Sequence, residues 1–271
     1  MRVGFIGLGS QGAPMARRIV DAGYPTTLWA RRPATLEPFT ATDAILADSP
    51  ADLAAASDLV CLCVVGDSDV DEVTAGPQGV LAGIKRGGVI AVHSTVHPRT
   101  CRELANKAAA VDVSVLDAPV SGGGPAAAEG RLLVMVGGDA QVVSCCRPVF
   151  ETFADSVVHL GELGSGLTTK LLNNLLFTAN LGTAASTLSL ADALGVAPDG
   201  LGEVVSRSSG NSFALNAIRG IGGLDRLAGH AGALLRKDLR LLVDLADDAA
   251  VQAGAVLDAA DAALAFMGHS R

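Results

Sequence analysis

Residues 1–12 of the 271-residue chain read Met-Arg-Val-Gly-Phe-Ile-Gly-Leu-Gly-Ser-Gln-Gly. The run Met1–Ile6 is short and apolar and ends at Gly7, which is typical of a buried strand followed by a turn. From Ala13 to Ala22 the apolar residues recur at helical spacing. The stretch therefore predicts a strand, a tight glycine turn and a helix, the first unit of an alternating β/α fold.

The glycines of this turn fit the pattern G-x-G-x-x-G at Gly7, Gly9 and Gly12. In that pattern the first glycine permits the turn, the second lets a pyrophosphate approach the backbone, and the third lets helix and strand pack closely. The helix N-terminus adds N–H donors and a partial positive charge. We therefore predict a dinucleotide-binding turn whose contacts come from Gly7, Leu8, Gly9, Gln11 and Gly12.

Further strand-like segments alternate with helical ones through the first 160 residues; they are Thr26–Ala30, Ser57–Val65, Gly88–Val92, Val113–Leu116, Leu132–Val136 and Val157–Leu160. Such alternation predicts a mostly parallel α/β sheet. After Gly166 the pattern becomes helical, beginning with one long helix over Leu167–Leu194. The expected fold is an α/β Rossmann-type N-terminal domain, residues 1–162, joined by a long interdomain helix to an all-α substrate and dimerisation domain, residues 163–271.

Further helices are expected over Ala197–Arg207, Ala214–Ile218, Ala231–Gln252 and Leu257–Met267. The helical domain is short for the apolar surface of its long helix, so we expect a second copy of the chain to cover part of that surface. A homodimer or homotetramer would do so.

Composition excludes several classes of protein. Hydrophobic residues make up 49% and charged residues 18%, an ordered globular profile, and the net charge of −8 disfavours nucleic-acid binding. The five cysteines are an odd number without a histidine at metal-ligand spacing, so we expect reduced thiols, a cytoplasmic protein and no metal site. The N-terminus reads as a strand rather than a signal peptide, and no apolar run is long enough to span a membrane.

The second predicted strand ends in Trp29-Ala30-Arg31-Arg32. An acidic residue at this position would hold the two hydroxyls of the adenosine ribose, whereas arginine suits a 2′-phosphate. We therefore expect NADP rather than NAD, bound through Arg31 and Arg32. The alternative is that both arginines are simply solvated.

Later motifs occur in a characteristic order: Asp117-Ala118-Pro119-Val120-Ser121-Gly122-Gly123, then Met135-Val136-Gly137-Gly138, Gly164-Ser165-Gly166 with Lys170 and Asn174, and Lys237-Asp238-Leu239. Together with the N-terminal glycine motif, this series resembles the 3-hydroxyisobutyrate dehydrogenase family of β-hydroxyacid dehydrogenases. The similarity covers nearly the whole chain.

The segment Ser121, Gly122 and Gly123 follows a strand, where consecutive glycine N–H groups and a seryl hydroxyl can hold a carboxylate. Lys170 and Asn174 are four residues apart and share one face of a largely apolar helix. Loss of hydration there would lower the pKa of a lysine towards a useful acid–base range. The resemblance implies that Lys170 exchanges the proton of the substrate hydroxyl and that Asn174 positions substrate and lysine. The alternatives are that Lys170 extends to water and that Asn173 takes the asparagine role.

The resemblance also implies supporting cofactor contacts from Val64, Val65, Thr95 and Lys237. The family often carries an aspartate two residues before the serine of its Ser94-Thr95 pair, and here Val92 stands in that place. His93 and His97 flank the pair without matching a catalytic position, so we interpret both as structural.

The expected reaction is the NAD(P)-dependent interconversion of a small 3-hydroxy acid, a carboxylate substrate, with its 3-oxo acid or semialdehyde. An imine reductase and a catalytically silent scaffold remain as alternatives.

Overall fold

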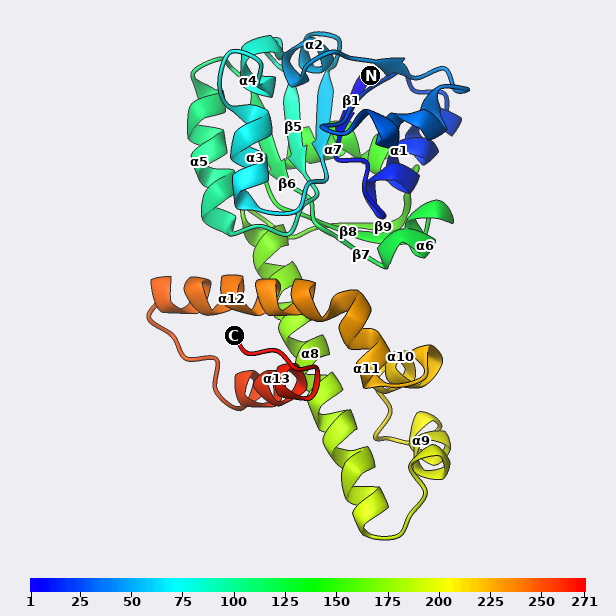
Figure 1. The fold of residues 1–271 in the computed structure, drawn as a ribbon. Helices are drawn as coiled ribbons and strands as arrows, with labels where there is room; N and C mark the ends of the chain where they lie inside the picture. The colour runs from blue at the N-terminus through cyan, green and yellow to red at the C-terminus, as the bar shows by residue number, and fades with distance from the viewer. The chain divides into compact units, whose positions relative to one another are not determined.

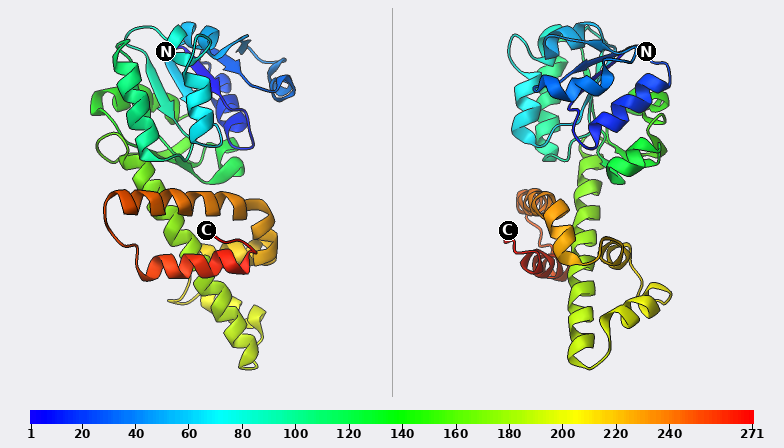
Figure 2. Two further views of the ribbon diagram at one scale, coloured as in Figure 1. Left: turned by 60° about the vertical axis from the view of Figure 1, so that its left-hand side comes forward. Right: turned by 45° about the vertical axis from the view of Figure 1, so that its right-hand side comes forward.

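The computed structural model describes all residues, 1–271, and they divide into two compact units, Met1–Lys170 and Leu171–Arg271. Figures 1 and 2 show strands and helices in the first unit and helices alone in the second. No helix combines the length and the apolar character needed to cross a bilayer.

The first unit is built on a six-stranded sheet in which every pairing is parallel. Its strands are β1 (Val3–Ile6), β2 (Thr26–Trp29), β3 (Ile45–Leu46), β4 (Leu59–Leu62), β5 (Val89–Val92) and β6 (Ser114–Asp117). They lie in the order β3-β2-β1-β4-β5-β6. The chain therefore builds the sheet outward from β1 in one direction and then, from β4, in the other. Such a reversal leaves a crevice at the carboxyl ends of β1 and β4, where open α/β sheets bind ligands.

Both faces of this sheet are buried, which explains why its strands read as continuous apolar runs. In β4, Leu59 and Cys61 pack against one face's core while Val60 and Leu62 pack against the other's. Helices α1 (Gly12–Asp21) and α7 (Ala140–Phe150) contribute to the first core. Helices α2 (Pro50–Ala55), α3 (Asp67–Thr74) and α5 (Pro98–Ala109) contribute to the second.

The remaining elements of the first unit are the 3₁₀ helix η1 (Pro33–Phe39), α4 (Val80–Gly83), α6 (Gly123–Ala128), β7 (Val120–Ser121), β8 (Leu132–Val136) and β9 (Ala154–His159). The last three strands form a second, mixed sheet in the order β7-β8-β9. A bridge between Asp117 and Gly137 connects the end of β6 to the end of β8.

The second unit contains the greater part of α8 (Ser165–Ala193), followed by α9 (Pro198–Ser206), α10 (Phe213–Ile221), α11 (Leu224–Leu227), the π-helix η2 (Ala228–Gly232), α12 (Ala233–Asp248) and α13 (Ala255–Phe266). In the right-hand view of Figure 2, α12 and α13 lie on one side of α8, and α9 and α10 on the other. Gly182 lets α13 pack closely against α8, because a Cβ there would clash with the carbonyl of Ala259.

The expected fold class is confirmed: a Rossmann-type parallel sheet followed by a helical region. Two strands, β3 and β7, were not expected, because a strand of two residues shows no periodicity. The nine strands also form two sheets rather than one. The helix expected over Ala231–Gln252 is shorter, since α12 begins after the π-helical turn and ends at Asp248.

Candidate active site

The glycine turn between β1 and α1 has the geometry of an anion cradle. Gly7 has a φ of +98°, and a side chain there would clash with the carbonyl of Cys63. A Cβ at Gly12 would clash with the carbonyl of Gly7, whereas a Cβ at Gly9 would meet no atom within 4 Å. The turn is thus closed on its inner side and open at Gly9, where a ligand could reach the backbone.

The first turn of α1 is available to such a ligand. Gln11 occupies the N-cap position, and no side chain caps the helix. Leu8 is buried beneath the turn. Because the first N–H groups of a helix lack intrahelical acceptors, an uncapped N-terminus favours a bound anion. The residues of this turn therefore fit the pyrophosphate of a dinucleotide.

The carboxyl ends of β4 and β5 meet beside this turn. The Val64 N–H donates to Ser94 Oγ at 2.8 Å, and Ser94 is almost fully buried. Val65 and Thr95 follow these two bonded residues in the chain. The structure therefore brings three segments with predicted cofactor contacts to one edge of the sheet: Gly7–Gly12, Val64 with Val65, and Thr95.

Arg31 and Arg32 follow β2 and are both exposed, but their surroundings differ. Arg31 Nη2 lies 2.9 Å from Asp69 Oδ1 and 2.8 Å from Glu72 Oε2. The hydrogen bond to Asp69 and the nearby charge of Glu72 raise the pKa of Arg31 above its usual value. The side chain of Arg32 has no acidic partner. Sequence reasoning did not anticipate that Arg31 would already be paired.

The predicted carboxylate loop lies next to the glycine turn. Ser121 ends β7, and Gly122 and Gly123 adopt positive φ angles of +130° and +74° before α6 begins. A Cβ at the next residue, Gly124, would lie 2.6 Å from the Ser10 carbonyl oxygen of the cofactor turn. This approach places the loop's glycine backbone beside the proposed pyrophosphate position.

Asp117 begins the motif that contains Ser121, and the sequence alone did not predict a role for it. Its carboxylate is 0% exposed and accepts N–H groups from Gly164 and Leu167, both at 2.6 Å. Burial raises the pKa of Asp117, and the backbone hydrogen bonds oppose that rise. Asp117 thereby ties the end of β6 to the first turn of α8. Lys170 lies three residues after Leu167, one turn further along the helix.

Asn174 and Lys237 lie in the second unit, where both contact Asp238. Asn174 Nδ2 donates to Asp238 Oδ2 at 2.6 Å. Lys237 Nζ lies 3.1 Å from Asp238 Oδ1, an ion-pair contact without hydrogen-bond geometry. Asn173 Nδ2 donates to Asn174 Oδ1 at 3.1 Å. Of the two candidate asparagines, Asn174 is thus the one held by a buried carboxylate.

The two histidines beside Ser94-Thr95 have structural contacts. His93 packs among three phenylalanines, Phe5, Phe150 and Phe153, with its Nδ1 2.8 Å from the Ala118 carbonyl oxygen. Burial lowers its pKa to about 4, so the ring is neutral at pH 7. His97 Nδ1 accepts the Arg99 N–H at the start of α5.

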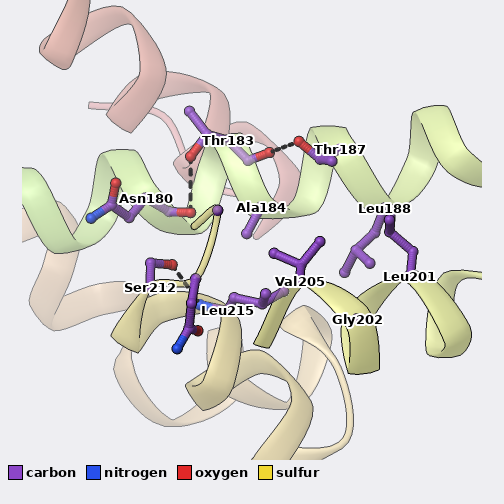
Figure 3. Close-up of a pocket in the computed structure, with 12 residues that line it drawn as sticks. Asn180, Thr183, Ala184, Thr187, Leu188, Leu201, Gly202, Val205, Ser212 and Leu215 are labelled. Atoms are coloured by element: carbon purple, nitrogen blue, oxygen red, sulfur yellow. Dashed lines mark hydrogen bonds between the residues drawn. The ribbon is translucent and has the colours of Figure 1, made fainter. Parts of the chain in front are cut away.

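The helical unit contains a cavity of about 370 Å³ between α8, α9 and α10. Figure 3 shows Ala184 and Leu188 on α8 directed towards Val205 and Leu215, with Thr183 and Thr187 also lining the cavity. The hydroxyl of Thr187 donates to the Thr183 carbonyl, so it is used within α8. No group of His, Cys, Asp and Glu side chains in the chain could hold a metal ion.

Comparisons with known proteins match both units. Residues 2–161 match the profile of the NAD binding domain of 6-phosphogluconate dehydrogenase. Residues 164–269 match the profile described as NAD-binding of NADP-dependent 3-hydroxyisobutyrate dehydrogenase. The chain belongs to the 3-hydroxyisobutyrate dehydrogenase family.

Individual members of the 3-hydroxyisobutyrate dehydrogenase family align over most of their length. The 3-hydroxyisobutyrate dehydrogenase of Pseudomonas aeruginosa is 34% identical over 95% of this chain and 88% of its own. The 2-(hydroxymethyl)glutarate dehydrogenase of Eubacterium barkeri is 34% identical over 90% of this chain and 82% of its own. A structure of Mycobacterium tuberculosis 3-hydroxyisobutyrate dehydrogenase with L-serine is 28% identical and superposes with a TM-score of 0.87, covering 99% of this chain and 94% of that one.

Membership of this NAD(P)-dependent dehydrogenase family agrees with the glycine turn at the sheet edge. The family's cofactor fits the residues present, because the open backbone at Gly9 and the uncapped N-terminus of α1 offer the space and the donors that a pyrophosphate requires.

Proposed function

We propose that the chain interconverts a small 3-hydroxy acid and its 3-oxo acid or semialdehyde, with NADP as the preferred cofactor over NAD. The observation that carries the proposal is the arrangement in the first unit. There the glycine turn, the loop Ser121–Gly123 and the Asp117-anchored start of α8 all adjoin the carboxyl edge of the parallel sheet. In this proposal the glycine turn binds the cofactor and the loop binds the substrate carboxylate, both close to the start of the helix that carries Lys170.

In this proposal the N–H groups of Gly122 and Gly123 and the hydroxyl of Ser121 bind the substrate carboxylate. Lys170 Nζ takes the proton of the 3-hydroxyl group during oxidation and returns it to the carbonyl oxygen during reduction. When bound, the nicotinamide would accept a hydride from carbon 3 of the substrate during oxidation and return one during reduction. The protein's contribution is to align these groups and to keep charge and geometry fixed.

Asn174 is proposed to orient substrate and lysine. Its amide nitrogen is committed to Asp238, and such a contact fixes which way the amide group faces. The roles given to Asn174 and to Lys237, a cofactor contact, rest on the family resemblance. So do those of Val64, Val65 and Thr95. The catalytic and cofactor residues are thereby divided between proposed domains 1–162 and 163–271.

Chemistry of the relatives supports this substrate class. 3-Hydroxyisobutyrate and 2-(hydroxymethyl)glutarate, named for two relatives, carry a hydroxyl on the carbon two bonds from a carboxyl carbon. L-Serine, present with the structural relative, has the same relation between hydroxyl and carboxylate. We propose that Arg31 and Arg32 bind the 2′-phosphate of NADP, because arginine cations are suited to phosphate groups.

We also propose that the chain forms a homodimer or homotetramer through its helical unit. Large apolar side chains are exposed there on and after α8, namely Leu190, Leu194, Val196, Val204 and Phe213. Burial of such a group by a second copy would remove apolar surface from water. Light scattering during gel filtration gives the mass directly, and Leu194→Asp should shift it towards the monomer. We expect the protein to work in the cytoplasm, since its five cysteines are all free thiols.

A substrate screen tests the function. The purified protein is incubated with 3-hydroxyisobutyrate, 2-(hydroxymethyl)glutarate, L-serine and 3-hydroxypropionate, each with NADP and NAD, and nicotinamide absorbance is followed. Semialdehydes and cyclic imines with NADPH cover the reverse direction and the imine reductase alternative. Turnover confined to imines would contradict the proposal, and cofactor binding without any turnover would favour the silent scaffold.

A further inference from the structure

Arg31, the cation placed to receive a 2′-phosphate, is already held by two carboxylates. Its Nη2 atom donates to Asp69 Oδ1 at 2.9 Å and to Glu72 Oε2 at 2.8 Å. Both acids belong to α3, which follows β4 and lies 38 to 41 residues further along the chain. Two carboxylates therefore lie beside the guanidinium to which NADP would bring its negatively charged 2′-phosphate.

The acids of α3 have separate tasks. Asp67 Oδ1 accepts the His97 N–H, and Asp71 pairs with Lys107. Only Asp69 and Glu72 face Arg31. Asp69 is also fixed from behind, because its second oxygen accepts the Gly66 N–H at 3.1 Å at the start of the helix.

The two acids hold Arg31 unequally. The Asp69 side chain is 23% exposed, whereas those of Arg31 and Glu72 are 56% and 60% exposed, so Asp69 is the fixed member of the three. Both acids bond to Nη2 and leave the N–H groups of Nη1 and Nε for a phosphate, but they fix the position of the guanidinium and offset its charge. A phosphate is therefore held less tightly by Arg31 than by an unpaired arginine, whereas an unmodified ribose needs no cation.

We propose that Asp69 and Glu72 are specificity-determining residues that restrain Arg31 and so weaken the discrimination of the chain between NADP and NAD. The inference rests on the proposed role of Arg31 at the 2′-phosphate. Arg32, which has no acidic partner, supplies a second cation for the phosphate whether or not Arg31 is released. A chain with both arginines and neither acid would favour NADP more strongly.

Glu72→Gln is the sharpest test, because the only ion pair of Glu72 is with Arg31, whereas Asp69 also caps α3. A charge pair at the surface is weak, so removing this one should tighten NADPH binding only about two- to fivefold. NADH binding should change less than about twofold, because NADH has no 2′-phosphate to compete for Arg31.

Binding can be read without turnover. Trp29 is the only tryptophan of the chain and lies at the end of β2, two residues before Arg31. Quenching of its fluorescence during titration with NADPH or NADH gives the two dissociation constants. Asp71→Asn is the matched control, since it removes an acid of the same helix that faces Lys107 instead. It should leave the NADH-to-NADPH ratio of dissociation constants unchanged.

A double-mutant cycle with Arg31→Ala separates the possible failures. The inference predicts that Glu72→Gln strengthens NADPH binding much less when Arg31 is absent. An equal gain with and without Arg31 would mean that Glu72 repels the phosphate directly, and the restraint would be refuted. If Arg31→Ala weakens NADPH selectively but Glu72→Gln changes nothing, the restraint alone is wrong. If Arg31→Ala leaves the ratio untouched, the 2′-phosphate assignment itself is wrong and the inference with it, while the dehydrogenase reaction is unaffected.

Discussion

Replacing Asp117 with alanine should destabilise the first unit strongly, because Asp117 is a fully buried acceptor for the first turn of α8. The change removes the acceptor of the Gly164 and Leu167 N–H groups, which are otherwise bonded at 2.6 Å. Each buried donor left without a partner costs about 1–3 kcal/mol, or about 2–6 kcal/mol for the two. Relief from burying the carboxylate offsets part of this, so we expect a loss of about 3 kcal/mol.

Urea unfolding followed by Trp29 fluorescence reports on this unit, since Trp29 lies in β2. The midpoint should fall while the dependence on urea stays the same. Asp139→Ala is a matched control. Asp139 caps α7 by accepting the Gln141 and Val142 N–H groups at 2.8 and 3.0 Å, but it is exposed.

Water can replace the lost acceptor at Asp139, so that variant should lose only about 1 kcal/mol. The contrast between the two aspartates measures what burial adds to a helix cap. Equal losses in both variants would refute the view that Asp117 is the anchor of α8.

Three further predictions concern the first unit. Gly9→Ala should leave the unfolding midpoint unchanged and weaken cofactor binding at least tenfold. Gly12→Ala should weaken cofactor binding and also lower the unfolding midpoint, because its Cβ would clash with the Gly7 carbonyl. Equal stability of the two variants would contradict this. His93 has a pKa lowered to about 4, so the unfolded chain takes up a proton that the folded chain refuses. Stability should fall by about 3 kcal/mol from pH 6.5 to pH 4 through this residue, and His93→Gln should flatten that part of the urea-denaturation profile. Cys145 is the one exposed thiol and Cys63 is half-buried, so a thiol reagent should modify Cys145 quickly in the native protein, Cys63 more slowly, and the other three cysteines only after unfolding.

Much of the first unit could be predicted because local sequence decides it. The glycines at 7, 9 and 12 dictate a strand, turn and helix, and the apolar runs of β4 and β5 are typical of strands buried on both sides. What local sequence does not carry is pairing at a distance. Strands β3 and β7, of two residues each, exist only through their neighbours.

The same limit applies to the candidate site. The bonds from Gly164 and Leu167 reach Asp117 across 47 and 50 residues, and no pattern in the sequence marks them. An acidic residue ending an apolar strand was the available signal, since a buried carboxylate requires donors. Likewise, the two arginines after β2 were readable as cations, but the pairing of Arg31 with α3 depends on how β4 lies next to β1.

Lys170 is the residue on which the proposed mechanism depends, and turnover of Lys170→Ala tests it most directly. The assay compares the variant with the wild-type chain on the best substrate of the screen, and Trp29 quenching measures NADPH binding in parallel. Removing a proton-transfer group costs about 10²–10⁴-fold in turnover, so the account predicts a loss in that range with the cofactor dissociation constant little changed. Turnover within about tenfold of the wild type, with NADPH still bound, would contradict the assignment of Lys170.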